Sequence, residues 1–267
     1  MKLVRIDKAD RPRYQARLAH FDEHWTYPYG EDRFRLDHGA DYYAFFDRLG
    51  EVSAHAFVEG DEILGMGIAI LRDVPFIAGE RPRKAWYLCG AKVHPDHRGQ
   101  GLSFRAATSR FLSHYVRCGR AYGITMNPGD GRENGVVRHA RRYRLASLHV
   151  AGVLGLFSLD EDAMRRLEDI VVQHRGPVSY LSLEGKKDLI MQSTQARLPL
   201  LHVQFGACAT RGEAAPRPGH THMFCALLED PLVRAMAAEG VEPSATATIV
   251  AHRMTKCDWK FVLTSDI

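Results

Sequence analysis

The stretch Ala91–Leu112, "AKVHPDHRGQGLSFRAATSRFL", joins an apolar strand to an amphipathic helix. Two glycines, Gly99 and Gly101, stand directly before the expected helix, interleaved with Arg98 and Gln100. Glycine permits a sharp turn and a close approach of the backbone to a ligand. The first turn of a helix presents unpaired N–H groups and the positive end of the helix dipole. The junction therefore predicts a phosphate-binding site.

The junction allows three other interpretations. A glycine-rich connection without any ligand is the simplest of them. A nucleotide P-loop is disfavoured because no Gly-Lys-Ser/Thr follows the glycines. A dinucleotide-binding turn would need G-x-G-x-x-G early in a parallel βαβ unit, and the sequence has no such pattern there.

The composition is that of a globular protein with an ample core. The chain has 267 residues, of which 45% are hydrophobic and 25% charged, enough for one large domain or two small ones. A net charge of +4 is too small to argue for nucleic acid and is compatible with an anionic small ligand. No apolar run approaches the ~20 residues of a membrane span, and the first residues are too polar for a secretory signal. The five scattered cysteines argue against a disulfide framework and a thiolate zinc site, so we expect a cytoplasmic protein.

The first part of the chain reads as helices followed by strands and then as alternating elements. We expect helices at 11–25 and 40–50, strands at 53–60, 62–75 and 83–93, a helix at 102–116, a strand at 120–127, a helix at 133–144 and a strand at 147–157. Meandering strands followed by alternating elements imply a mixed sheet, an α/β chain of the α+β type. The segment 26–39 reads as a loop.

The pattern loosens after Ser158. We expect helices at 161–174 and 230–240, the second with Asp230 as its cap, and strands at 200–206, 220–228 and 245–254. The segment 210–219, "TRGEAAPRPG", reads as a surface loop whose prolines lack the N–H groups that a phosphate needs. We therefore expect this region to pack on the first part, with a strand at the edge of its sheet.

The segment "VHPDHRGQGLS" resembles the acyl-CoA-binding motif of the GNAT family of N-acyltransferases, R/Q-x-x-G-x-G/A. Arg98 fills the first position and Gly101 the fourth, while Ser103 stands where the family usually has glycine or alanine. The order of elements over about 1–157 also agrees. The resemblance implies a GNAT domain at 1–158, followed at 159–267 by a packed α/β extension; whether this extension is itself GNAT-like, without its own motif, stays open.

The resemblance also assigns the residues that bind acyl-CoA. The backbone after Arg98 would cradle the pyrophosphate, and the strand before it would line the pantetheine arm. The residues so assigned are Ala91, Lys92, Val93, Arg98, Gly99, Gln100, Gly101, Leu102, Ser103 and Asn134.

The expected catalytic groups are only partly present. Members of the family commonly use a glutamate or an ordered water near the strand as base, and a tyrosine on the later helix as acid. Strand alternation places Lys92 on one face with Trp86 and Leu88, and no carboxylate lies on either face of 83–93. The base must therefore come from elsewhere or from water. Cys89 could act as a nucleophile, but a buried cysteine is usually inert packing.

The proton donor is expected on the helix at 133–144. If Asn134 is the anchor of the family pattern, Arg141 occupies the tyrosine position and Tyr143 follows two residues later. The candidates are Tyr143, His139 or no side chain at all. A tyrosine that merely anchors the helix end is the structural alternative for Tyr143.

The segment after the first helix is expected to shape the acceptor pocket, as the resemblance implies. Its carboxylates would suit a cationic amine and its aromatic rings the apolar part, although a solvated loop explains the same residues. These residues are Tyr27, Tyr29, Glu31, Asp32, Asp37, His38 and Asp41. The pairs His20 with His24 and His220 with His222 lack a third ligand, so we expect no metal.

The predicted function is transfer of an acyl group from acyl-CoA to a primary amine of a small molecule or peptide side chain by direct attack. Acetyl-CoA is the expected donor, and a longer acyl-CoA stays open. The alternative is a non-catalytic acyl-CoA-binding sensor on the same fold. We expect no nucleic acid partner and no membrane span, and a homodimer is left open.

Overall fold

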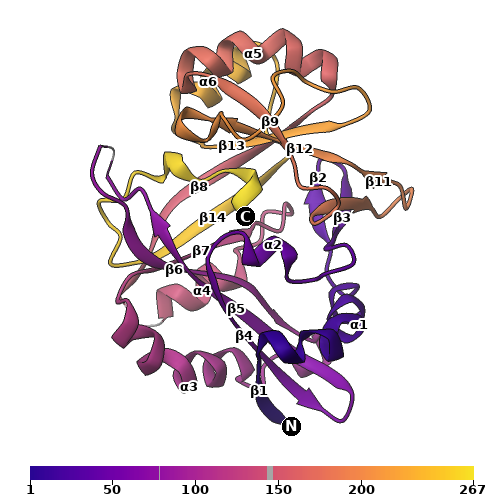
Figure 1. Ribbon diagram of the computed structural model, residues 1–267, viewed down its shortest axis with the longest axis vertical. Coiled ribbons are helices and arrows are strands. Elements are labelled where there is room, and N and C mark those ends of the chain that lie inside the picture. Colours follow the sequence, from indigo (N-terminus) through magenta and orange to yellow (C-terminus); the bar gives the residue numbers. More distant parts are fainter. Residues whose placement is uncertain (78, 143–146) are drawn as a thin grey trace.

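A computed structural model describes residues 1–77, 79–142 and 147–267 (Figure 1). Most strands form one sheet: β1 (Lys2–Ile6), β4 (Glu51–Glu59), β5 (Glu62–Val74), β6 (Arg83–Val93), β7 (Ala121–Met126), β8 (Leu148–Leu159), β9 (Val178–Ser182), β12 (Leu200–Phe205), β13 (Thr221–Leu227) and β14 (Ala245–His252). In the described residues its ten strands run in the order β1-β4-β5-β6-β7-β14-β8-β13-β12-β9.

A second, smaller sheet joins distant parts of the chain. Its strands are β2 (Tyr27–Tyr29), β3 (Asp32–Asp37), β10 (Asp188–Met191) and β11 (Arg197–Leu198), in the order β11-β10-β3-β2. The segment expected to be a loop is thus a β2–β3 hairpin, and this part of the prediction was wrong. Its strands are short and carry charged residues, and β3 obtains a further partner, β10, only through the tertiary fold.

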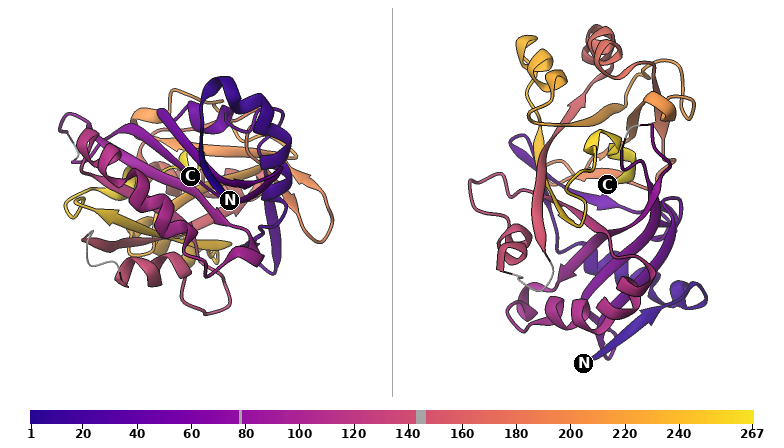
Figure 2. Two further views of the ribbon diagram at one scale, coloured as in Figure 1. Left: turned by 90° about the horizontal axis from the view of Figure 1, so that it is seen from below. Right: turned by 90° about the vertical axis from the view of Figure 1, so that its left-hand side faces the viewer.

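Helices lie on both faces of the large sheet. They are α1 (Arg11–Asp22), α2 (Ala44–Asp47), α3 (Leu102–Arg117), α4 (Gly135–Arg142), α5 (Glu161–Arg175) and α6 (Pro231–Ala238). The main core lies on the face covered by α1, α2, the small sheet and the C-terminal segment. Helices α3 and α4 cover one end of the other face and α5 and α6 the other end (Figures 1 and 2). None of the described helices has the length and apolarity needed to cross a membrane.

The helix ends follow from ordinary capping chemistry. The side chain of Asp160 accepts a hydrogen bond from Ala163 N at the start of α5, and Asp230 accepts one from Leu232 N at the start of α6. The predicted cap at Asp230 is confirmed. The helix expected at 11–25 ends at Asp22, and the one expected at 40–50 is reduced to the four residues of α2.

The last strand of the chain lies inside the sheet. Strand β14 pairs with β7 over Ala121–Met126 on one side and with β8 on the other. Strand β8 in turn pairs with β13. Each half of the chain therefore supplies a strand that separates two strands of the other half, so the sheet continues across residue 158. Strand β13 adds to the edge of the first part's sheet beside β8, as we expected, whereas β14 is inserted between β7 and β8.

Candidate active site

The glycine turn has the geometry that the sequence predicts. Gly99 and Gly101 have φ of +82° and +72°, in the left-handed region that favours glycine. Gly101 is the residue that precedes α3, and a Cβ added at either glycine would meet no atom within 4 Å. The space above the turn is open, so the backbone N–H groups at the start of α3 face a site that a phosphate can enter.

Directly beside this turn, two parallel strands separate. Strands β6 and β7 pair at only three positions, Trp86–Ala121, Tyr87–Tyr122 and Leu88–Gly123. Beyond these positions, residues 89–93 of β6 and 124–126 of β7 do not pair with each other. A Cβ at Gly123 would lie 3.0 Å from the carbonyl oxygen of Leu88, so glycine permits the close contact at which the strands part.

We call the unpaired residues 89–93 of β6 and 124–126 of β7 the β6 arm and the β7 arm. The opening between the two arms is accessible from the side of the β6 arm. Leu88 is 46% exposed, Ala91 is exposed, and Lys92, Val93 and the facing residues of β7 are partly buried. The backbone groups of β6 that point into this opening can pair with the amides of an extended ligand.

Asn134 holds the β7 arm to helix α4. Its Nδ2 donates to the carbonyl oxygen of Met126 at 2.8 Å, and its Oδ1 accepts from Val136 N at 2.9 Å. Asn134 is buried, so these contacts position the strand end and the helix start. A cofactor-binding role for its side chain stays a prediction.

A β-bulge changes the face on which Lys92 lies. Met66 pairs with Lys92 and Ile68 with Cys89, so two residues of β6 oppose one residue of β5. Gly90, inside the bulge, has φ of +58°. The extra residue moves the Lys92 side chain to the face of Cys89, and our assignment by simple alternation was wrong.

Lys92 belongs to a buried polar cluster that sequence reasoning missed. Its Nζ lies 2.8 Å from Asp22 Oδ1, at the end of α1. Tyr42 donates from its hydroxyl group to Asp22 Oδ2 at 3.0 Å, and His38 Nε2 lies 3.4 Å from the same oxygen. All four side chains are at least nine-tenths buried. We call Asp22, His38, Tyr42 and Lys92 the aspartate cluster.

The charge states of the aspartate cluster follow from burial and its contacts. Burial by itself would raise the pKa of Asp22, but the contact with His38 and the charge of Lys92 outweigh burial and lower that pKa. Burial lowers the pKa of His38, and the neighbouring Asp22 only partly opposes this. At neutral pH His38 is therefore a neutral imidazole beside a carboxylate. Since Nε2–H faces Asp22, Nδ1 carries the lone pair, and among the described residues it has no hydrogen-bond partner.

A second buried lysine lies on the same face of the sheet. Lys187 lies with its Nζ 4.5 Å from the centre of the Phe45 ring and 3.5 Å from the carbonyl oxygen of Thr264. Burial, aided by the charge of Arg48, lowers the pKa of Lys187 to about 7. Burial raises the pKa of the Cys89 thiol to about 12, so Cys89 is protonated and is packing material, as its sequence context suggested.

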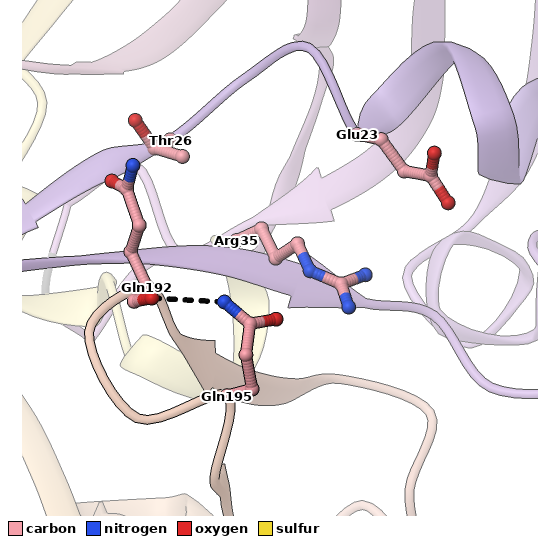
Figure 3. A pocket seen from close by; sticks show the side chains of 5 residues that line it. All are labelled: Glu23, Thr26, Arg35, Gln192 and Gln195. Carbon is pink, nitrogen blue, oxygen red and sulfur yellow. Dashed lines mark hydrogen bonds between the residues drawn. The ribbon is translucent and has the colours of Figure 1, made fainter.

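A hollow of about 310 Å³ lies between the segment after α1, strand β3 and the turn between β10 and β11. Figure 3 shows the side chains that line it. Arg35 of β3 points into it, and Gln195 Nε2 donates to the carbonyl oxygen of Gln192 at 2.8 Å. The remaining lining residues are Glu23 and Thr26. This hollow is too open and too polar to enclose a substrate, although it adjoins the segment that we expected to shape the acceptor pocket.

The structure brings most of the predicted cofactor residues together. The β6 arm, the glycine turn and the start of α4 surround the open end between β6 and β7. The side chains of Ser103 and His139 are not described, and Tyr143 lies outside the described residues. Whether these residues act as assigned stays a prediction.

The comparisons with known proteins bear on the fold. The chain is similar to a solved tandem GNAT protein from the clavulanic acid biosynthesis pathway, at 12% identity and a TM-score of 0.56, over 95% of this chain and 99% of that one. The chain has the GNAT fold. The expected fold class, a mixed α/β sheet of the GNAT type, is thereby confirmed.

Similarity in sequence is weaker. An uncharacterized protein of Acanthamoeba polyphaga mimivirus is 21% identical over 232 residues, which cover 85% of this chain and 68% of the viral protein. No protein-family model matches the chain. The glycine turn is recognisable by its local motif, whereas Asp22 and Tyr42 have no local signal. They lie 20 residues apart, and Asp22 lies 70 residues before Lys92.

Proposed function

We propose that this chain is an acyl-CoA-dependent N-acyltransferase that acts on a primary amine of a small molecule or peptide side chain. The observation that carries the proposal is the open separation of β6 and β7 beside the start of α3. The free backbone groups of Cys89–Val93 suit the amides of the pantetheine arm, and the helix start suits the pyrophosphate. The structural relative is itself named as a GNAT protein, which supports acyl transfer with acetyl-CoA as the expected donor.

In the proposed reaction the amine nitrogen attacks the thioester carbonyl carbon. A C–N bond forms, the C–S bond breaks, and the thiolate of CoA leaves with the bonding electron pair. The amine loses one proton to a base, and the thiolate gains one from an acid. Positioning and proton transfer are thus what the side chains must supply.

We infer that His38 is the general base that the strand lacks. Three observations support this role: His38 is neutral, Asp22 orients its ring, and its Nδ1 has no partner among the described residues. Lys92 links Asp22 to the open arm of β6. The arrangement is that of a carboxylate holding an imidazole in one tautomer.

For the proton donor we retain Tyr143 and His139 as proposed candidates. Both belong to the part of the chain that follows the β7 arm. A cytoplasmic location is part of the proposal, and the five cysteines, all free, are consistent with a reducing compartment. A homodimer is neither required nor opposed by the proposed chemistry.

Native mass spectrometry of the purified protein tests the donor first. We expect one acyl-CoA per chain, whose mass gives the length of the acyl group. Turnover is then followed as CoA thiol release with a panel of primary amines. Binding without release for any amine would favour the non-catalytic sensor, and absence of CoA binding would reject both functions.

A further inference from the structure

A surface pocket of about 550 Å³ lies between α1, the β4–β5 turn and the segment before the glycine turn. Four of its lining residues are histidines: His20, His24, His94 and His97. They come from two parts of the chain about 70 positions apart, and only the tertiary fold assembles them.

The imidazoles of His24 and His94 face each other through their Nε2 atoms. His24 Nε2 lies 3.3 Å from His94 Nε2, and the ring centres are 4.6 Å apart. A tetrahedral metal with bonds of about 2.0–2.1 Å to each nitrogen would hold the two nitrogens roughly 3.3–3.4 Å apart. The observed distance fits two ligands of one ion.

Hydrogen bonding fixes the tautomer of His24. Its Nδ1 lies 3.1 Å from the carbonyl oxygen of Phe21. A carbonyl oxygen only accepts, so Nδ1 carries the hydrogen and Nε2 carries a lone pair that points at His94. A ligating histidine commonly has this arrangement, with the other ring nitrogen donating to a backbone carbonyl group.

The contacts of His94 allow both tautomers. Its Nδ1 lies 3.4 Å from Asp96 N and 3.8 Å from Asp96 Oδ2. If Nδ1 accepts from the backbone, Nε2–H donates to His24 in a long hydrogen bond. If Nδ1–H faces the carboxylate, two lone pairs face each other, and a cation between them would relieve the repulsion.

Further ligands lie close by. The ring centre of His20 is 5.8 Å from that of His24, and the centre of His97 is 5.8 Å from that of His94. The carboxylates of Asp61, Glu62 and Asp96 line the same pocket, and the one arginine among its lining residues, Arg17, lies 3.3 Å from Asp61. Among the described residues no three such side chains already converge on one point, so a third ligand must turn inward.

We propose that His24 and His94 form a binding site for a divalent transition metal that prefers imidazole ligands, represented by Zn²⁺, with His20 or His97 completing the site. The site would fasten the end of α1 to the segment that leads into the glycine turn. The proposal does not depend on acyl transfer. From the sequence we expected no metal, because the two central ligands, His24 and His94, are far apart along the chain.

The test is calorimetric titration of Zn²⁺ into the full chain after removal of any histidine tag. We expect saturable binding of one ion per chain, and d–d absorption of a tetrahedral complex when Co²⁺ replaces Zn²⁺. His24→Gln and His94→Gln should each weaken binding tenfold or more. The matched control is His174→Gln at the end of α5, which should bind as the wild type does.

Thermal unfolding without metal checks that each variant folds, and His24 is exposed enough to tolerate the change. A double variant with His20→Gln and His97→Gln should bind at least tenfold more weakly than wild type, and unchanged binding would reject the assigned third ligand. The proposal is overturned if wild-type protein shows no saturable binding, or if His24→Gln and His94→Gln bind Zn²⁺ as tightly as His174→Gln.

Discussion

Within the part of the chain that the structure describes, the large sheet contains two parallel strand pairs that separate in the same way, and one of them is open. Strands β6 and β7 pair at three positions and then part, and so do β12 and β13. Between β6 and β7 the arms are partly exposed. Between β12 and β13 the arms carry Val203, Phe205, Phe224 and Ala226, all buried against α5 and α6.

The connections differ as sharply as the arms. A sixteen-residue helix with glycines before its start joins β6 to β7. The connection from β12 to β13 begins with the short 3-10 turn Gly206–Cys208 and continues into the proline-containing loop. In this loop Glu213 exchanges two backbone hydrogen bonds with Tyr180 of β9, at 2.8 and 2.9 Å. A Cβ at Gly212 would lie 2.6 Å from the backbone of Tyr180, so this glycine serves a contact between strands.

Separated strands alone are therefore not sufficient for a cofactor site of the proposed kind. Both pairs have the strand geometry, but only the first has free arms and a helix start facing an open space. We therefore expect one CoA per chain. The loop between β12 and β13 pairs with the edge of β9 through Glu213, so its position is explained by its structural role.

The largest effect should come from closing the open site. Gly101→Val would place a branched side chain where the phosphate must approach, at a φ of +72° that strains it. CoA binding should fall below detection by calorimetry. Gly176→Val is the matched control, because Gly176 ends α5 with a φ of +77° and open space around it. CoA affinity in Gly101→Val equal to that of the control would remove the turn from the site.

His38→Gln tests the proposed base. It should lower kcat by about 10²–10⁴-fold with CoA affinity unchanged. Because the pKa of His38 lies below its ordinary value, the wild-type rate should persist as pH falls to about 6.5, and the imidazole should lose its role only below that. A rate that pH and the substitution leave unaltered would point to water as the base.

Tyr143→Phe tests the proposed acid. Removing the phenol hydroxyl group should lower kcat by about 10²–10⁴-fold and leave CoA binding intact. His139→Gln is its counterpart on α4. Should neither variant slow the reaction, the leaving thiolate takes its proton from solvent.

A substitution that opens the buried separation between β12 and β13 should lower the free energy of unfolding and create no second CoA site. The ring of Phe224 stacks on Phe157 with centres 4.8 Å apart, and Phe224 is fully buried. Phe224→Ala should lower the free energy of unfolding by about 3–5 kcal/mol. Calorimetry should still give one CoA per chain, whereas two would contradict the distinction between the pairs.

The last prediction concerns Lys187, whose electrostatic neighbours include Cys89 of β6 and Cys225 of β13. Its pKa falls from 10.5 to about 7 on folding, so the unfolded chain binds more protons between these pH values. This difference should raise the free energy of unfolding by up to about 1.4 kcal/mol per pH unit as pH rises in that window. Lys187→Met should be more stable than wild type at pH 7, with the advantage shrinking towards pH 10. Urea unfolding at several pH values measures the two slopes, and parallel slopes would contradict the assignment.

Several elements could be read from the sequence because their signals are local. The strand at 83–93 is confirmed to the residue, and the helix from Leu102 begins where the glycines predicted it. Strand β1 and the hairpin Tyr27–Asp37 were missed. Their residues are partly exposed and carry charges, so their pattern resembles that of a loop, and their pairing partners lie far along the chain.

The glycine turn before α3 was predictable from the sequence alone, since the conformation of glycine and the polarity of a helix start are properties of adjacent residues. Which strand separation stays open depends on the tertiary structure, because side chains and helices from other parts of the chain fill one separation and leave the other free. The bulge at Gly90 turned Lys92 towards Asp22, and the fold brought His24 to His94. Contacts between distant segments are set by packing, and a linear pattern carries no record of them.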